Sequence, residues 1–252
     1  MRQNKTGYAS IDLPQSMDST FFEKNPLIPN ANIYTTIKLL STFYMDKCAV
    51  NCFDLNASYG KILDDAVTVS LALKELGVKK GEIISVCMPN FYQALVVFLA
   101  CNRIGAITTF IDAKASVEDI CYYLNEFETP IFVNFDSTLL ENKKIKENTK
   151  VKYIITLDKS KVNSLDLSGD FKITTYELKL VFSSLGSIAK FRKIKFEKLH
   201  AGKEDAVILF TSGSTGKPKS VVLTNENILA AEIYAKNTSH TENITGPKTL
   251  TC

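Results

Sequence analysis

Short apolar runs alternate with helical patterns along most of this chain, and this alternation constrains its fold more than any other feature. Runs with the length and composition of buried strands occupy residues 83–88, 106–111, 130–135, 151–156 and 206–210, followed by a shorter strand-like run at 221–223. Segments with helical spacing of apolar residues occupy 59–76, 91–104, 116–127, 137–147 and 224–236. Apolar strands that alternate with helices form parallel sheets covered on both faces. We therefore predict an α/β fold, a mostly parallel sheet flanked by helices.

Local signals place the ends of several of these helices. Gly77 and Gly105 each follow a helical segment, where glycine commonly ends a helix, and Ser116 with Asp119 has the spacing of a helix N-cap. Residues 35–44 also show helical spacing, which predicts a helix whose apolar side consists of Ile37, Leu40, Phe43 and Tyr44. Residues 1–30 are irregular and contain three prolines, and the stretch 157–203 is less regular, with one further helix expected at 176–185.

The charge pattern argues against a nucleic-acid partner. The net charge is only +3, from 30 basic and 27 acidic residues. Three of the basic residues are arginines, the side chain that usually reads bases and clamps phosphates: Arg2, Arg103 and Arg192. The most basic stretch, 190–198, fits a solvated strand or linker face better than a patch for polyanions. We expect no nucleic-acid partner.

The cysteines indicate a reducing compartment and no metal site. Cys87 and Cys101 lie inside apolar runs, where a free thiol behaves as a small hydrophobic side chain. Cys48 and Cys52 are four residues apart, but no second cysteine pair follows and no histidine lies nearby in the sequence. The opening residues lack the apolar core of a signal peptide, and the longest apolar run, 94–101, is far shorter than the roughly 20 residues that span a bilayer. We expect a cytoplasmic protein with no membrane span.

A loop rich in hydroxyls and glycines stands between the last two strand-like runs. Residues 211–219 read Thr-Ser-Gly-Ser-Thr-Gly-Lys-Pro-Lys. Glycines let backbone amides converge on an anion, serine and threonine supply short donors, and a lysine supplies positive charge, which here is Lys217 or Lys219. The loop follows a strand, and open α/β sheets bind ligands beyond the carboxyl ends of their strands. This combination predicts a site for the phosphates of a nucleotide.

The loop is not a Walker loop. Only two residues separate its glycines, and Pro218 follows Lys217 where the Walker motif has serine or threonine. Proline also prevents a helix from starting with free amides at this point, so any phosphate contacts come from the loop itself. The alternative is a mobile linker, although a linker has no need to sit between two apolar runs or to carry Lys-Pro-Lys.

The ordered string from Leu209 to Asn227 closely resembles the signature loop of the adenylate-forming enzymes, which include acyl-CoA synthetases, luciferases and the adenylation domains of peptide synthetases. Ser220 stands where the family usually has glycine, and Asn225 where many members have histidine. Upstream segments at 58–63, 76–82 and 103–112 resemble family segments in the same order, so the resemblance covers about residues 35–252. The opening residues and 102–112 are most similar to bacterial fatty acyl-CoA synthetases.

This resemblance implies a two-step reaction. A carboxylate attacks the α-phosphate of Mg-ATP, which gives an acyl-adenylate and pyrophosphate, and a thiol then displaces AMP. The thiol is that of coenzyme A or of a carrier protein. The implied ATP phosphate-binding residues are Thr211, Ser212, Gly213, Ser214, Thr215, Gly216 and Lys219. The resemblance assigns the conserved basic position to Lys219 rather than Lys217, and it implies ATP, Mg²⁺ and coenzyme A as the small molecules used.

Other parts of the family's active site have no counterpart here. The segments that form the acyl pocket, the Tyr-Gly-x-Thr-Glu motif, the ribose-binding aspartate and the C-terminal catalytic lysine are not found. We therefore expect no catalytic residue beyond phosphate positioning, no metal ligands, and no activity from this chain alone. A non-catalytic remnant that binds phosphate weakly, an adenylation domain that loads a carrier protein, and a structural α/β domain stay open as alternatives.

By the same resemblance, the chain is the first subdomain of a truncated N-terminal domain with parts of a second. Residues 53–224 form the α/β subdomain that ends in the phosphate loop, while 1–52 and 225–252 belong mainly to an incomplete second subdomain. We expect the helix after Thr224 to have an uncovered apolar side formed by Ile228, Leu229 and Ile233.

Overall fold

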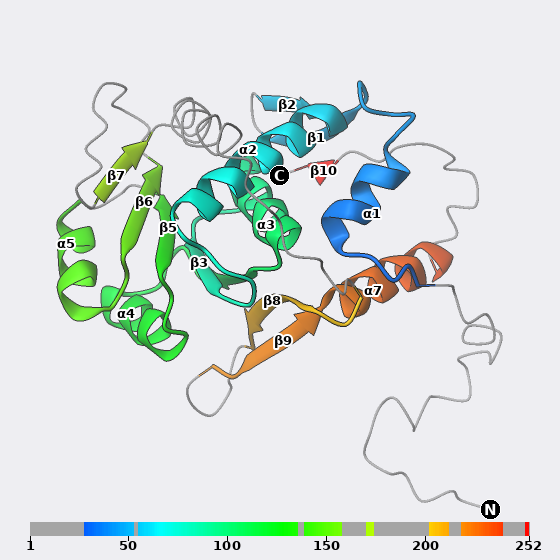
Figure 1. The fold of residues 1–252 in the computed structure, drawn as a ribbon. Helices are drawn as coiled ribbons and strands as arrows, with labels where there is room; N and C mark the ends of the chain where they lie inside the picture. Colours follow the sequence, from blue (N-terminus) through cyan, green and yellow to red (C-terminus); the bar gives the residue numbers. More distant parts are fainter. Residues whose placement is uncertain are drawn as a thin grey trace, which may run out of the picture.

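The computed structural model describes residues 28–52, 55–135, 139–157, 170–173, 202–211, 218–238 and 250–251. The expected helix at 176–185 and the basic stretch at 190–198 lie outside these residues. The described part is built on a seven-stranded sheet with helices against it and a separate three-stranded sheet (Figure 1).

The large sheet has the strand order β7-β6-β5-β3-β4-β8-β9. Its strands are β3 (Ile83–Cys87), β4 (Ile107–Ile111), β5 (Ile131–Phe135), β6 (Tyr153–Leu157), β7 (Asp170–Ile173), β8 (Asp205–Phe210) and β9 (Ser220–Thr224). Every neighbouring pair is parallel except β8 and β9, which run antiparallel. The mostly parallel sheet predicted from the alternation of strands and helices is therefore confirmed.

Helices cover both faces of this sheet. They are α2 (Tyr59–Glu75), α3 (Tyr92–Ile104), α4 (Val117–Glu126) and α5 (Leu139–Asn148). Successive side chains of a strand point to opposite faces. Ile131 and Val133 of β5 accordingly belong to the core that includes α2 and α3, whereas Phe132 belongs to the core that includes α4 and α5. Figure 1 shows α4 and α5 on the side of the sheet away from α2 and α3.

The predicted helix ends are correct where local signals define them. The Ser58 hydroxyl accepts a hydrogen bond from the Lys61 amide at the start of α2, and the Ser116 hydroxyl accepts one from the Asp119 amide at the start of α4. Such N-caps satisfy amides that have no partner inside the helix. Gly105 ends α3 with a φ of 74°, in the left-handed region that glycine adopts without strain.

The first helix, α1 (Ile33–Leu40), begins two residues before the helix predicted at 35–44 and ends four residues before its end, so Phe43 and Tyr44 lie beyond it. Ile33 and Tyr34 are buried and Ile37 packs against the main core, while Leu40 is 73% exposed and Phe43 is 88% exposed. The physical reason is that hydrogen bonds hold the first turn of α1 against α3 and the helix that follows β9, so the last turn projects outward.

The helix after β9, α7 (Asn225–Thr238), is covered on the side that was expected to be open. Leu229 is buried and Ile228 packs against the main core, and Ile233 is half-buried. The expectation of an uncovered apolar side on this helix is therefore wrong. Contacts with α1 provide part of the cover, as Figure 1 shows.

The small sheet has the order β10-β1-β2, so it pairs the last described residues of the chain with an early strand. β1 (Cys48–Cys52) pairs antiparallel with β2 (Leu55–Ser58), and β10 (Leu250–Thr251) pairs parallel with β1 through Val50 and Leu250. The subdomain boundaries at residues 52 and 224 stay a prediction, although β2 lies within the predicted 53–224 subdomain and pairs with β1 in the small sheet.

Candidate active site

The candidate site lies at one edge of the large sheet. Because β3, β4, β5, β6 and β8 are parallel, their carboxyl ends lie at the same edge, and the segment 211–219 follows β8 there. The strands β3 and β5 are neighbours, but the chain leaves them toward opposite sides of the sheet: from β3 it continues to β4, and from β5 it continues to β6. Open α/β sheets bind ligands beyond the strand carboxyl ends, commonly at such a switch point. The loop lies along the same edge, and β4 separates β8 from the switch point.

The two ends of the predicted phosphate loop are held together. Phe210 of β8 pairs with Ser220 of β9. One residue further along, the Thr211 amide donates a hydrogen bond of 2.9 Å to the Lys219 carbonyl, and the Thr211 hydroxyl lies 3.3 Å from the same oxygen. The pairing of β8 with β9 thus continues by one step to Thr211 and Lys219, the first and last residues of the loop.

The structure brings together the two predicted site residues that it describes. Thr211 and Lys219 are both exposed at the carboxyl edge. The other five predicted residues lie outside the described part of the chain: Ser212, Gly213, Ser214, Thr215 and Gly216. Their roles in phosphate binding therefore stay a prediction.

The strand that leads into the loop is firmly embedded. Ala206, Val207 and Ile208 of β8 are buried, and the Thr109 hydroxyl of β4 donates to the Ile208 carbonyl at 3.3 Å. Fully burying such side chains stabilises the fold by roughly 1.5–3 kcal/mol each. The loop therefore extends from a rigid strand, which is the arrangement a positioned binding loop requires.

The return strand is fixed by a buried amide that sequence reasoning missed. Asn225, the first residue of α7, is 2% exposed. Its side-chain oxygen accepts from the Ile33 amide at 3.1 Å and from the Asn102 side chain at 2.7 Å, and its side-chain nitrogen donates to the Glu204 carbonyl at 3.0 Å. The only sequence signal was that asparagine replaces a common histidine at this position. The contacts tie α7 to α1, α3 and the start of β8.

One acidic residue, Asp112, follows β4 at the same edge of the sheet. Thr109 of β4 is aligned with Ile208 of β8. The residues three positions further along each chain segment are Asp112 and Thr211, so the same register places these two beside each other. The Asp112 carboxylate is exposed and accepts a hydrogen bond from the Lys114 amide. Within the described residues, no group of three or more His, Cys, Asp or Glu side chains is placed to hold a metal ion.

A tyrosine at the same edge is kept in its neutral form. Tyr92 begins α3 directly after the carboxyl end of β3, and its hydroxyl donates to Asp65 at 2.8 Å. Lys61 pairs with the same carboxylate at 2.6 Å and lies over the Tyr92 ring. Burial raises the pKa of Tyr92 well above its usual value, and the charge of Asp65 raises it further. This cluster joins α2 to α3 and holds its lysine in an ion pair.

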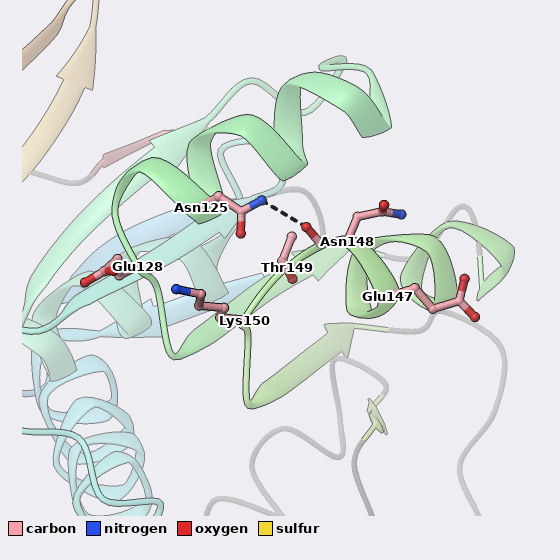
Figure 2. Close-up of a pocket in the computed structure, with 6 residues that line it drawn as sticks. All are labelled: Asn125, Glu128, Glu147, Asn148, Thr149 and Lys150. Atoms are coloured by element: carbon pink, nitrogen blue, oxygen red, sulfur yellow. Dashed lines mark hydrogen bonds between the residues drawn. The ribbon is translucent and has the colours of Figure 1, made fainter.

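A polar cavity of about 590 Å³ lies at the opposite edge of the sheet. It is lined where α4 and α5 lead into the amino ends of β5 and β6, by Asn125, Glu128, Glu147, Asn148, Thr149 and Lys150 (Figure 2). The Asn125 amide donates to the Asn148 carbonyl at 2.9 Å across it, while the Glu147 side chain extends away from the others. Of the predicted site residues that the structure describes, neither Thr211 nor Lys219 lines this cavity.

Comparisons of this sequence with known proteins agree on one enzyme family. A sequence model of the family described as AMP-binding enzyme matches residues 41–250. An acetyl-coenzyme A synthetase of Coprinopsis cinerea is 28% identical over 182 residues, which is 68% of this chain and 26% of that protein. A long-chain-fatty-acid–CoA ligase of Bacillus subtilis is 25% identical over 223 residues, 81% of this chain and 38% of that protein. The chain thus spans well under half the length of these relatives.

Solved structures share the fold. The anthranilate CoA ligase AuaEII, in complex with anthranoyl-AMP, aligns with a TM-score of 0.67 at 17% identity, covering 83% of this chain and 38% of that one. The long-chain-fatty-acid-CoA ligase FadD1 of Archaeoglobus fulgidus aligns with a TM-score of 0.67 at 20% identity, covering 86% of this chain and 41% of that one. Among the described residues, no helix has the length and apolar character needed to cross a bilayer.

Proposed function

Because this chain belongs to the AMP-binding enzyme family, we propose that it is the N-terminal part of an ATP-dependent adenylate-forming ligase, an acyl-CoA synthetase. The observation that carries the proposal is the hydrogen-bonded contact between Thr211 and Lys219, which closes a hydroxyl- and glycine-rich loop at the carboxyl edge of a parallel sheet. The names of its relatives, acetyl-coenzyme A synthetase and long-chain-fatty-acid–CoA ligase, support a carboxylic acid and coenzyme A as the other substrates.

The proposed chemistry has two steps. A carboxylate oxygen attacks the α-phosphorus of ATP, the bond from that phosphorus to the bridging oxygen breaks, and pyrophosphate leaves. The thiol of coenzyme A then attacks the acyl carbon of the adenylate, loses its proton, and releases AMP. A carrier-protein thiol is the alternative acceptor.

The loop would act on the leaving group. Hydroxyls and backbone amides of 211–216 would donate hydrogen bonds to the β- and γ-phosphates, and the Lys219 ammonium would offset the negative charge that builds up on pyrophosphate. Catalysis by such a loop consists of positioning and charge stabilisation. The resemblance to the family also implies Mg²⁺, which when bound would offset part of the charge of the ATP phosphates.

We also propose that this chain by itself binds phosphate without completing the reaction. It spans 26% to 38% of the relatives named above, and the groups expected to hold adenine, ribose and the acyl chain are not among its motifs. A cytoplasmic location is proposed from the reduced state expected of its cysteines, of which Cys101 and Cys121 are free thiols.

Calorimetric binding of pyrophosphate and ATP to this chain tests the proposal. Lys219→Ala should weaken binding by roughly 10- to 100-fold, the usual effect of losing a hydrogen bond to a charged group. Lys217→Ala, at a position that varies in the family, is the matched control and should change binding far less. Equal affinities for the wild-type chain and Lys219→Ala would contradict the assignment. Exchange of labelled pyrophosphate into ATP by this chain, with acetate or a long-chain fatty acid, would contradict its proposed inactivity.

A further inference from the structure

Two aromatic side chains pack against Phe210, the residue that precedes the phosphate loop. Phe210, the last residue of β8, lies with its ring centre 4.3 Å from that of Tyr123 and 5.8 Å from that of Phe127. Both partners belong to α4 or directly follow it, four residues apart, so they lie on the same side of the helix. We call Tyr123, Phe127 and Phe210 the aromatic clamp.

The clamp sits where it can set the direction of the loop. Phe210 pairs through its backbone with Ser220, and the next residue, Thr211, donates its amide to Lys219. Phe210 is therefore bonded to the first residue of the loop and paired with the residue that directly follows its last one. Beyond the buried part of β8, the residues of the hairpin nearest the loop are open to solvent, because Leu209, Val221 and Val222 are each at least 40% exposed.

We propose that Tyr123 and Phe127 are positioning residues that orient the phosphate loop through Phe210. This inference rests on the proposed function, since it assigns the clamp a role in presenting Thr211 and Lys219 to phosphate. Contacts between aromatic rings stabilise by more than their buried area alone, so leucine at these positions keeps an apolar contact but loses the contact between rings.

The experiment compares leucine substitutions at two aromatic contacts of the same kind. Phe127→Leu, Tyr123→Leu and Phe210→Leu disturb the clamp. Phe98→Leu is the matched control, because Phe98 of α3 contacts Phe110 of β4 at 6.4 Å and has no part in the clamp. Amide hydrogen exchange of Thr211 reports on the base of the loop, and calorimetry reports pyrophosphate affinity.

We expect Phe127→Leu and Tyr123→Leu to speed exchange of the Thr211 amide roughly two- to tenfold relative to Phe98→Leu at a similar melting temperature, and to weaken pyrophosphate binding by a comparable factor. The double variant Phe127→Leu with Phe210→Leu should add little to either single change. Thr211 exchange equal to that of Phe98→Leu would overturn the proposal, whatever happens to stability. If the wild-type chain binds no pyrophosphate, the proposed function fails, and the exchange data still decide whether the clamp orients the loop.

Discussion

The buried amide of Asn225 should make a large contribution to stability. Asn225→Ala would remove the acceptor of the Ile33 amide and of the Asn102 side chain, and would leave both donors buried without a partner. Each such loss costs about 1–3 kcal/mol. In this variant the Glu204 carbonyl still accepts a hydrogen bond from the backbone amide of residue 225, so losing its side-chain donor adds little to the cost. We therefore expect a loss of about 3 kcal/mol in the free energy of unfolding, or roughly 6–12 °C in melting temperature for a chain of this size.

Urea denaturation followed by circular dichroism measures this loss. Asn227→Ala is the matched control, because Asn227 lies two residues further along α7, is exposed, and serves only to cap the helix through Thr224. Its loss should cost about 1 kcal/mol. Asn102→Ala combined with Asn225→Ala should cost clearly less than the sum of the single variants, since the two amides bind each other. Additive effects, or equal losses at 225 and 227, would refute the reasoning.

Three further expectations follow from burial and exposure. Cys101 is fully buried, and burial raises the pKa of its thiol to about 12. Iodoacetamide should therefore label the partly exposed Cys48 and spare Cys101 in the folded protein, as measured by peptide mass spectrometry. Equal labelling of the two cysteines would contradict the buried position of Cys101. The folded-state pKa of Tyr92 is raised above the unfolded value of about 10, so its stabilisation is complete below that pH and decreases as the pH rises further. Tyr92→Phe should therefore flatten the alkaline loss of stability in urea titrations, and an unchanged slope would argue against the contact with Asp65. Phe43→Ser, at an exposed apolar position, should change the melting temperature by little and reduce self-association in sedimentation experiments; a loss above about 1 kcal/mol would place Phe43 in the core.

Local signals explain why much of the fold is predictable from the sequence. The bounds of α2, α3 and α4 agree with prediction to within one residue at each end, because Ser58, Gly105 and Ser116 define their ends chemically. The strands of the parallel sheet are continuous apolar runs, since they are buried on both faces. The distinctive string around Thr211 and Lys219 places the loop between β8 and β9, whereas its role in binding phosphate stays a prediction.

Long-range contacts explain what could not be predicted. Asn102 and Asn225 are 123 residues apart, and nothing in the sequence around either one indicates a buried polar partner. The exposed end of α1 follows from that same network, which overrides the apolar spacing of the helix. The aromatic clamp likewise joins α4 to β8 across a large sequence separation, and each of its rings looks like an ordinary core residue when read locally.

The pairing of β1 with β10 has a consequence for the order of events during synthesis. Val50 aligns with Leu250, and the Ile33 amide binds Asn225. At a translation rate of about 5–20 residues per second, roughly 10–40 s separate the emergence of these partners from the ribosome. During that interval the α1 and β1 region has neither partner, so a chaperone or a transient non-native contact has time to engage it. The parallel strands from β3 to β6, whose neighbours in the sheet follow closely in the chain, can assemble first.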